Sequence, residues 1–300
     1  MKVNISHKNI IILTYLTNYN IRVIKDYISL YNNFDVLLEV ISKNFNYTDK
    51  AILEAKSKAC TSIDKLKYHD IQSISIYDDN YPKLVKRIAD APPILYYKGQ
   101  LRDCDLSAIV GSRNVSKHAN KITSEITDWL NEVNHGVVSG LALGIDSFAH
   151  KRALLNNQYT VAVLPNSLDS IYPSENYDLA NQILDKKGCL ISEMIFNINR
   201  GKRSFVQRNR IQSALSQAVI PIEMGINSGT MHTINFAKKY GKKIMLFNPT
   251  PMLKDMNEYE GILHLINNPH KNQRIFNNKE EFILRINSSL RDSQIGMNFD

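Results

Sequence analysis

Short apolar runs alternate with amphipathic helical segments from about residue 71 onward, and this alternation restricts the fold more than any other feature of the chain. The runs include SAIVGS, GVVSG, TVAVLP, CLISE, AVIPIEM and KIMLFN, and the helical segments include KITSEITDWLNEV and TINFAKKYG. Strands that are apolar throughout are buried on both faces, and a helix after each strand covers such a sheet. The pattern predicts an α/β domain over residues 70–290, with a doubly wound, mostly parallel sheet.

The first 68 residues show a helical periodicity instead. Apolar residues recur at three- and four-residue spacing in IIILTYLTN, IRVIKDYISLY, FDVLLEVISKNF and KAILEAKSKA, with Asn-rich breaks between them. Thr48 precedes the last segment and is a suitable N-cap. Residues 1–80 carry 10 Lys and Arg against 9 Asp and Glu. We interpret residues 1–68 as a small, nearly neutral helical domain with a packing or interaction role.

The net charge of +8 in this 300-residue chain is concentrated in its middle. Residues 81–250 carry 21 Lys and Arg against 13 Asp and Glu. One stretch without an acidic residue contains the aromatic Phe205 and five basic residues, Arg200, Lys202, Arg203, Arg208 and Arg210. A solvated basic face would account for such a run. Basic side chains around an aromatic ring are also what binding of a polyanion with stacked bases requires.

The composition excludes several classes of protein. Hydrophobic residues make up 43% and charged residues 22%, which is typical of a folded soluble chain. We find no run of 18 apolar residues and no cleavable leader, so we expect neither a membrane span nor a signal peptide. Cys60, Cys104 and Cys189 lie far apart without a C-x-x-C pair, which argues against a disulfide framework or a zinc site. We therefore expect a cytoplasmic protein without a metal ion.

Small residues follow three of the predicted strands. They form the segments Gly111–Arg113, Ser139–Asp146 and Asn227–Thr230. In a doubly wound sheet such turns meet at the carboxyl edge of the strands, where ligands bind. Glycine allows backbone amides to approach a phosphate closely, and the following helix N-terminus attracts negative charge. Three such turns, one of them with Arg113, predict a cradle for a polyanion.

Several of these side chains also have structural interpretations. Arg113 could pair a nearby carboxylate instead of a ligand. Asp146 and His150 are spaced to share a helix face and could act as an acid–base or metal pair, but a capping aspartate and a packed histidine are the interpretation we favour. Arg208 and Arg210 flank Asn209 near the predicted helix RIQSALSQA, and we expect one arginine to reach phosphate and the other to hold the loop.

Sequence signatures of common enzymes are missing. The chain lacks the dinucleotide motif G-x-G-x-x-G, the Walker motif G-x-x-x-x-G-K-[ST] and the nucleophile elbow G-x-S-x-G. We therefore expect no catalytic residue and no cofactor.

An ordered series of motifs resembles the family of the DNA-processing protein DprA, also called Smf. The motifs are YPKLVKRIADAPPILYYKG, VGSR, SGLALGIDSFAH, TVAVLPNSLDSIYPSEN, SE, FVQRNR and NSGTMHT, over residues 70–290. The resemblance implies an extended Rossmann-like core that dimerises, binds single-stranded DNA and helps to load the RecA recombinase during DNA uptake and recombination. It also implies that residues 1–68 are similar to a sterile-alpha-motif domain. We expect no C-terminal winged helix of the kind that some members carry.

The resemblance assigns backbone contacts to Gly111, Ser112 and Arg113, a basic contact to Lys202 and base stacking to Phe205. The chain departs from the family at Val206 and Pro165, where proline and glycine are usual. Together with the three turns, these assignments give an expected DNA-binding set: Gly111, Ser112, Arg113, Ser139, Gly140, Gly144, Lys202, Phe205, Arg208, Asn209, Arg210, Ser228, Gly229 and Thr230.

The alternative function is that of a nucleotide-binding or nucleotide-hydrolysing relative of the phosphoribohydrolases. Those enzymes carry a P-G-G-x-G-T-x-x-E motif whose glutamate takes part in the reaction. Aligning that motif on Gly229 and Thr230 places Thr233 at the position of the glutamate. This argues against hydrolysis and leaves open the binding of a small nucleotide.

Overall fold

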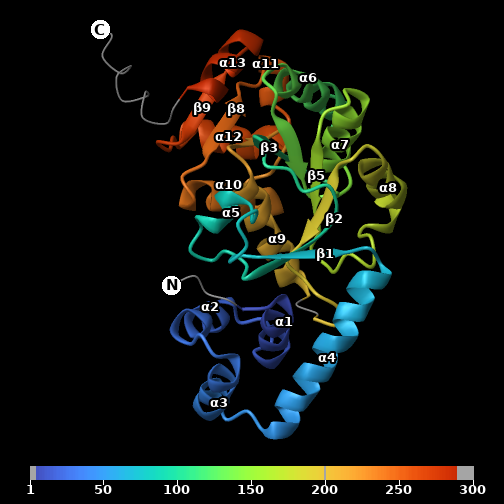
Figure 1. Ribbon diagram of the computed structural model, residues 1–300. Helices are drawn as coiled ribbons and strands as arrows, with labels where there is room; N and C mark the ends of the chain where they lie inside the picture. The colour runs from blue at the N-terminus through green and yellow to red at the C-terminus, as the bar shows by residue number, and fades with distance from the viewer. Residues whose placement is uncertain (1–4, 199–200, 289–300) are drawn as a thin grey trace.

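The computed structural model describes residues 5–198 and 201–288, which form four N-terminal helices followed by a nine-stranded sheet with helices on both faces (Figure 1). The N-terminal helices are α1 (His7–Leu16), α2 (Ile21–Leu30), α3 (Phe34–Phe45) and α4 (Asp49–Tyr68). Thr48 is the N-cap of α4 and accepts a hydrogen bond from the backbone N–H of Ala51 at 3.2 Å, as predicted.

The sheet confirms the predicted α/β class. Its strands are β1 (Gln72–Ser75), β2 (Ile94–Gly99), β3 (Leu106–Val110), β4 (Gly136–Ser139), β5 (Thr160–Val163), β6 (Cys189–Ser192), β7 (Ala218–Pro221), β8 (Lys243–Phe247) and β9 (Gln273–Phe276). Their spatial order is β1-β2-β6-β5-β4-β3-β7-β8-β9. The six strands from β5 to β9 in this order are parallel and follow the classic Rossmann arrangement, which β6, β2 and β1 extend.

Strand β2 was not among the predicted runs. It pairs antiparallel with both β1 and β6, so it belongs to the extension and not to a strand–helix–strand unit. A periodicity search for alternating strands and helices does not find such a strand, because no helix follows it.

Helices cover the sheet on both faces and continue the chain between strands. They are α5 (Lys83–Lys86), α6 (Ala119–Glu132), α7 (Ile145–Leu155), α8 (Tyr177–Asp185), α9 (Lys202–Leu215), α10 (Gly229–Lys239), α11 (Pro251–Lys254), α12 (Glu260–Asn267) and α13 (Lys279–Asn287), with short 3-10 turns at Ser174–Asn176 and Asn257–Tyr259. Within the described residues, no helix is both long and apolar enough to cross a membrane.

Three apolar clusters form the core. One lies between the sheet and α9, α10 and α12, and a second lies between the opposite face and α6, α7 and α13. The third joins residues of α1–α4, such as Ile10 and Leu37, to Tyr96 of β2, Leu190 of β6 and Ile183 of α8. The N-terminal helices therefore share a continuous core with one end of the sheet.

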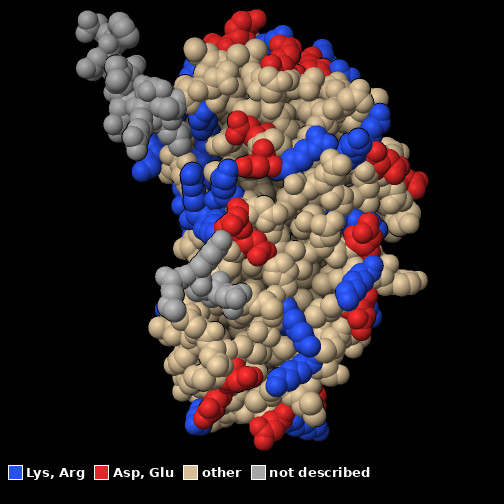
Figure 2. All heavy atoms as spheres, in the orientation of Figure 1, with Lys and Arg blue, Asp and Glu red and all other residues tan. Residues whose placement is uncertain are grey.

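Charged side chains are distributed unevenly on the surface in Figure 2. Acidic and basic residues alternate over the N-terminal helices, whereas Lys and Arg gather over α5 and the end of α10. Lys86 belongs to α5, and Lys238 and Lys239 belong to the last turn of α10. These three lysines are separated in the sequence from the turn Gly111–Arg113.

Candidate nucleic-acid interface

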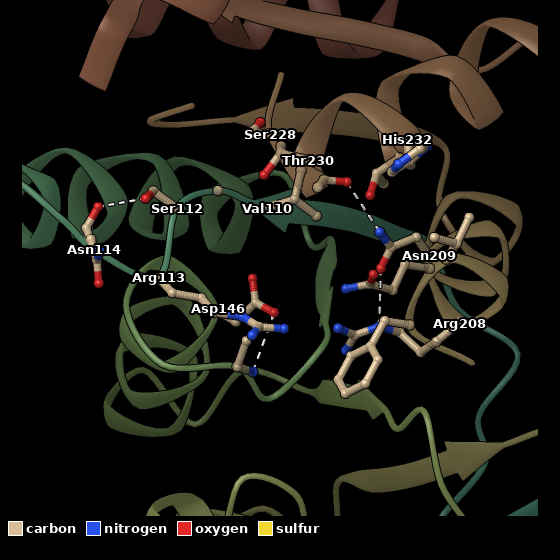
Figure 3. A pocket seen from close by; sticks show the side chains of 17 residues that line it. Val110, Ser112, Arg113, Asn114, Asp146, Arg208, Asn209, Ser228, Thr230 and His232 are labelled. Carbon is tan, nitrogen blue, oxygen red and sulfur yellow. Dashed lines mark hydrogen bonds between the residues drawn. The ribbon is translucent and has the colours of Figure 1, made fainter. Parts of the chain in front are cut away.

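A cavity of about 530 Å³ opens where β3 and β7 end side by side (Figure 3). The turn after β3, the beginning of α10 and side chains of α9 form its walls. The chain leaves β3 for α6 on one face of the sheet and leaves β7 for α10 on the other face. The cavity thus occupies the topological switch point, where doubly wound proteins bind their ligands.

Close packing fixes the turn after β3. A Cβ atom on Gly111 would lie 2.5 Å from Cγ1 of Ile145, so only glycine fits there. The backbone N–H of Ser112 donates to the carbonyl of Glu223 at 2.8 Å, and its carbonyl accepts from the N–H of Ile145 at 3.2 Å. The turn is held between β7 and α7, and it presents Arg113 to the cavity.

Arg113 is exposed, and no carboxylate of the described residues pairs with it. Its guanidinium carbon lies 5.5 Å from the centroid of the Phe205 ring. A cation over an aromatic face is favourable even when it is partly hydrated. The alternative interpretation, in which Arg113 forms an ion pair with a carboxylate, is therefore not supported by the described residues.

Phe205 lies between this cavity and a second one of about 400 Å³. The second cavity is lined by apolar residues that include Leu143, Pro165 and Ile171, and it shares Arg113 with the first. The ring of Tyr172 meets Phe205 edge to face, with centroids 5.4 Å apart. The half-buried Phe205 therefore has polar surroundings on one side and apolar surroundings on the other.

Helix α9 positions the basic run. It begins at Lys202, earlier than the predicted helix RIQSALSQA, so Phe205 and Arg208 belong to the helix. Arg208 is buried and donates to the carbonyl of Val163 at 2.8 Å and to that of Gly140. The Arg208 side chain lines both cavities. Its two hydrogen bonds also connect the backbone at the ends of β4 and β5.

Asp146 lies beside Arg208, and backbone N–H groups bind its carboxylate. Its carboxylate accepts hydrogen bonds from the N–H groups of Gly140 at 3.0 Å and Ala142 at 3.3 Å. Burial raises the pKa of Asp146, and the charge of Arg208 opposes that rise. Asp146 thus holds the loop after β4 in place.

His150 does not form a pair with Asp146. Its Nδ1 atom lies 2.8 Å from the hydroxyl oxygen of Thr160, and the residue is fully buried outside both cavities. Burial, with a smaller contribution from Arg208, lowers the pKa of His150 to about 3. No group of three potential metal ligands occurs among the described residues. The favoured interpretation, a packed histidine, agrees with this geometry.

The beginning of α10 forms the opposite wall. Its N-cap, Ser228, makes no side-chain cap, and its buried hydroxyl has no hydrogen-bond partner within the described part of the chain. Gly229 and Thr230 follow in the first turn, where backbone N–H groups have no partner within the helix. Asn209 of α9 donates to the carbonyl of Gly229 at 3.3 Å and so joins the two helices at the cavity.

The structure corrects one of the expected contacts in the loop after β4, that of Ser139, and leaves those of Gly140 and Gly144 as predictions. Ser139 is fully buried and donates its hydroxyl to the carbonyl of Ile109 at 2.7 Å, so it does not reach a ligand. Gly144 has a φ of 78° and packs against the Ser112 carbonyl, and it lines neither cavity. Gly140 borders only the second cavity, under Arg208. These residues shape the loop that supports the site.

The N-terminal part of the basic run lies beside the site. Lys202 is exposed in the first turn of α9 but lines neither cavity, so its contact with DNA stays a prediction. Arg200 lies outside the described residues.

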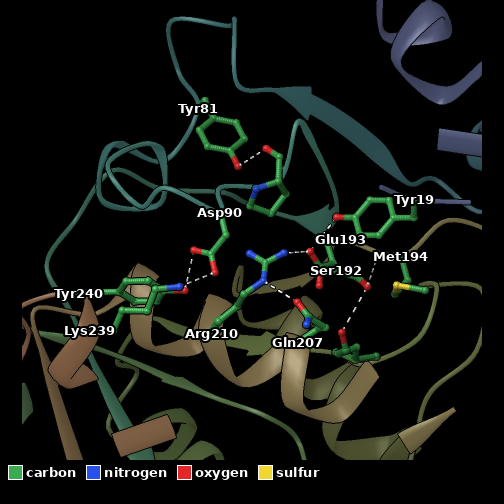
Figure 4. A network of polar contacts seen from close by, with 12 residues as sticks. Tyr19, Tyr81, Asp90, Ser192, Glu193, Met194, Gln207, Arg210, Lys239 and Tyr240 are labelled. Atoms are coloured by element: carbon green, nitrogen blue, oxygen red, sulfur yellow. Dashed lines mark hydrogen bonds and ion pairs between the residues drawn. The ribbon is translucent and has the colours of Figure 1, made fainter. Parts of the chain in front are cut away.

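The prediction that Arg210 contacts DNA is wrong. Its side chain is 1% exposed and forms an ion pair with Glu193, which also accepts a hydrogen bond from the Tyr19 hydroxyl at 2.7 Å (Figure 4). Arg208 and Arg210 are two positions apart, and side chains at that spacing point about 200° apart around a helix. One arginine therefore faces the cavity and the other faces the N-terminal helices.

Some lining residues escaped the analysis of the sequence. His232 lies at the end of the first turn of α10, on the same side as Gly229, and Tyr172 comes from the loop after β5. The helical spacing from Gly229 could have indicated His232. Nothing in the local sequence indicates Tyr172, because its place beside Phe205 depends on how the loop folds back.

Comparisons with known proteins agree with this fold. The family model described as DNA recombination-mediator protein A matches residues 72–285. Protein Smf of Borreliella burgdorferi is 31% identical over 252 residues, covering 79% of this chain and 78% of that protein. Protein Smf of Synechocystis is 36% identical over 197 residues, which are 64% of this chain and 48% of the relative, so the chain spans about half the length of that protein.

Two structures of DNA processing protein A are among the similar solved structures. The X-ray structure of DNA processing protein A from Streptococcus pneumoniae has a TM-score of 0.67 and 29% identity, with 94% of each chain covered. DNA processing protein A from Helicobacter pylori has a TM-score of 0.62 and 29% identity, over 74% of this chain and 96% of that one.

The strand order and the position of the cavity define a Rossmann-like protein with a cavity at the switch point, on the carboxyl edge of its sheet. The chain belongs to the DprA/Smf family of DNA-processing proteins, since the family model covers more than half of its residues.

Replacement of Arg210 by alanine is expected to lower the free energy of unfolding by about 3–5 kcal/mol, because Glu193 would keep a buried charge without its partner. Chemical denaturation followed by circular dichroism measures this. The control is Lys83→Ala, which breaks an exposed ion pair with Asp103 and should cost less than about 1 kcal/mol. Equal losses in the two variants would show that the Arg210–Glu193 pair does not stabilise the fold.

Proposed function

We propose that this protein binds single-stranded DNA at the carboxyl edge of its sheet. The backbone of the strand would lie against Gly111–Arg113 and the beginning of α10, and one base would stack at Phe205. The observation that carries this proposal is the exposed, unpaired Arg113 within 5.5 Å of the Phe205 ring, at the mouth of one cavity. A phosphate and the base attached to it could be bound there together.

The polar groups around the cavity suit a phosphodiester. Arg113 offers a planar set of donors, the first turn of α10 offers backbone N–H groups, and Ser228 offers a hydroxyl. The buried charge of Arg208 adds a positive potential beneath them. Asp146 is the one acidic side chain that lines the cavity within the described residues, and backbone N–H groups already bind it.

Similarity to characterised structures supports the choice of ligand. The Helicobacter pylori structure is described as giving insight into the single-stranded DNA binding mode of DNA processing protein A. That protein shares 29% identity with this chain and is covered over 96% of its length.

The wider role in the cell is a second part of this proposal. As the family resemblance implies, the protein would act as a homodimer that protects incoming single strands and helps to load RecA in DNA uptake and recombination. We place it in the cytoplasm, where the free thiols of Cys60, Cys104 and Cys189 would stay reduced. Sedimentation would test the homodimer. A RecA-filament assay on single strands coated with this protein would test the loading of RecA.

We also propose that binding is its whole activity. A hydrolase related to the phosphoribohydrolases would need a carboxylate at the cavity, but Thr233 stands at the expected position and Asp146 is held by the loop after β4. His150 faces Thr160 and is kept neutral by burial. These residues provide no free general acid or base.

Arg113→Ala is expected to weaken binding of single strands with little change in the melting temperature, because the side chain is exposed and, among the described residues, makes no hydrogen bond or ion pair and contacts only the ring of Phe205. The slope of log K against log salt should become less steep by about 0.7, the value for one lost phosphate contact. Fluorescence anisotropy with a labelled oligonucleotide at several salt concentrations measures both. The matched control is Arg22→Ala, an exposed arginine of α2 far from the cavity in sequence and structure. An unchanged slope would mean that Arg113 does not contact phosphate.

Phe205→Ala is expected to cost about 1–3 kcal/mol of DNA-binding free energy, the usual contribution of one stacked base. Phe205→Trp should retain binding, because it keeps an aromatic face beside Arg113 and Tyr172. Thermal melts recorded beside the titrations separate a lost contact from a damaged fold. Normal binding by the alanine variant would remove Phe205 from the site.

Incubation with AMP or labelled single strands, with and without divalent metal, is expected to release no base and to leave the strands intact. Chromatography of the products provides the measurement. Release of base that disappears in Asp146→Asn would contradict the binding-only proposal and would favour the hydrolase.

A further inference from the structure

A second basic hollow lies at the amino edge of the sheet, opposite the cavity described above. It has a volume of about 540 Å³, and its basic lining residues are Lys239, Lys242 and Lys243 from the segment between the end of α10 and the start of β8 and Arg87 from the end of α5. Apolar residues of the α5 region, such as Leu84 and Ile88, complete the lining. No Asp or Glu of the described chain lines it. It belongs to the region where Lys and Arg gather in Figure 2.

Two cations in this hollow lie close together without a counter-charge. Lys242 is 9% exposed, and burial with the nearby charge of Arg87 lowers its pKa to about 8. Arg87 is exposed and makes no hydrogen bond or ion pair within residues 5–198 and 201–288. Bringing an anion between them would relieve this repulsion, and an arginine is well suited to bind phosphate.

A structural role explains only part of the arrangement. The Lys242 ammonium donates to the carbonyl of Ala214 at 2.9 Å and so closes the end of α9. Lys239 at the end of α10 is paired with Asp90 at 3.1 Å. Neither contact accounts for Arg87, whose guanidinium remains available to a ligand.

The two sites lie at opposite ends of the same pair of helices. Helices α9 and α10 both begin at the first cavity, with Phe205 and Gly229, and both end at the hollow, near Gln217 and Lys239. Helix α10 has 11 residues, which corresponds to a length of about 16 Å. A strand of a few nucleotides can cover that distance.

The outer face of α10 carries aromatic and basic side chains, as the first cavity does. His232 is exposed at its start, and Phe236 and Tyr240 follow at four-residue spacing on the same face. The rings of Phe236 and Tyr240 are stacked, with centroids 5.8 Å apart, and the Lys239 ammonium lies 5.4 Å from the centroid of Tyr240. Both rings are half-buried, so an aromatic surface with a basic neighbour is open to solvent. Such a surface is typical of sites that bind successive bases of a single strand.

We infer that the basic hollow of Arg87, Lys239 and Lys242 is a second phosphate site, reached by a single DNA strand that runs along α10 from the first cavity. This inference rests on the proposed function, because it extends the path of the same strand. Phe236 offers a stacking surface on the way, and Arg87 binds a phosphate at the end.

Oligonucleotides of two lengths test the inference. A strand of about two nucleotides is shorter than α10 and reaches the first cavity only, whereas one of about twenty nucleotides reaches both sites. Arg87→Glu should leave the affinity for the short strand unchanged and should weaken binding of the long strand about tenfold, the effect of one lost charge-assisted contact. Lys58→Glu is the matched control, since it changes the net charge equally at an exposed position on α4.

Each outcome has a distinct meaning. Equal affinities for the long strand in Arg87→Glu and Lys58→Glu would overturn the second site, and so would an equal loss for both lengths in Arg87→Glu. The proposed function would stand in either case if Arg113→Ala still weakened binding of both lengths. If the wild-type protein bound neither strand, the proposed function and this inference would fail together. Phe236→Ala provides an independent measurement and should also affect the long strand alone.

Discussion

The buried guanidinium of Arg208 is the interaction on which the candidate site depends. It binds the carbonyls of Gly140 and Val163, and so joins the ends of two neighbouring strands beneath the cavity. Asp146 stands beside it and binds the backbone of the same loop. A buried charge is stable only where it is paired and hydrogen-bonded, so this arrangement fixes the edge of the sheet before any ligand arrives. The turn with Arg113 then rests on a rigid base.

Helix α9 also connects the cavity with the rest of the molecule. Arg210, on the opposite side of the helix, binds Glu193 at the end of β6, and Glu193 accepts the hydroxyl of Tyr19 from the N-terminal helices. One helix thus connects the cavity, the extension of the sheet and α1–α4. Tyr19, Glu193 and Arg210 are all buried, so these contacts form a continuous packed connection between the N-terminal helices and α9.

The general fold could be predicted from the sequence because it depends on patterns that are local. Strands such as SAIV and TVAV are apolar at every position, and each is followed by a helix, so their burial in a parallel sheet follows from their composition. The glycine of Gly111–Arg113 was found for the same reason, as a small residue directly after a strand. Strand β2 was missed since no helix follows it and its partner β6 is distant in the chain.

The amino-acid sequence by itself determined the class of fold, the edge of the sheet where the cavity opens, and Gly111, Arg113, Phe205 and Thr230 as residues that line it. Only the tertiary structure decided which arginine of the FVQRNR motif faces the cavity, because Arg208 and Arg210 look alike in sequence and differ by a rotation around α9. It also decided that Ser139 is buried, that Tyr172 meets Phe205, and that α10 connects two basic regions. These features depend on contacts between segments far apart in the chain, and the local pattern of residues does not encode such contacts.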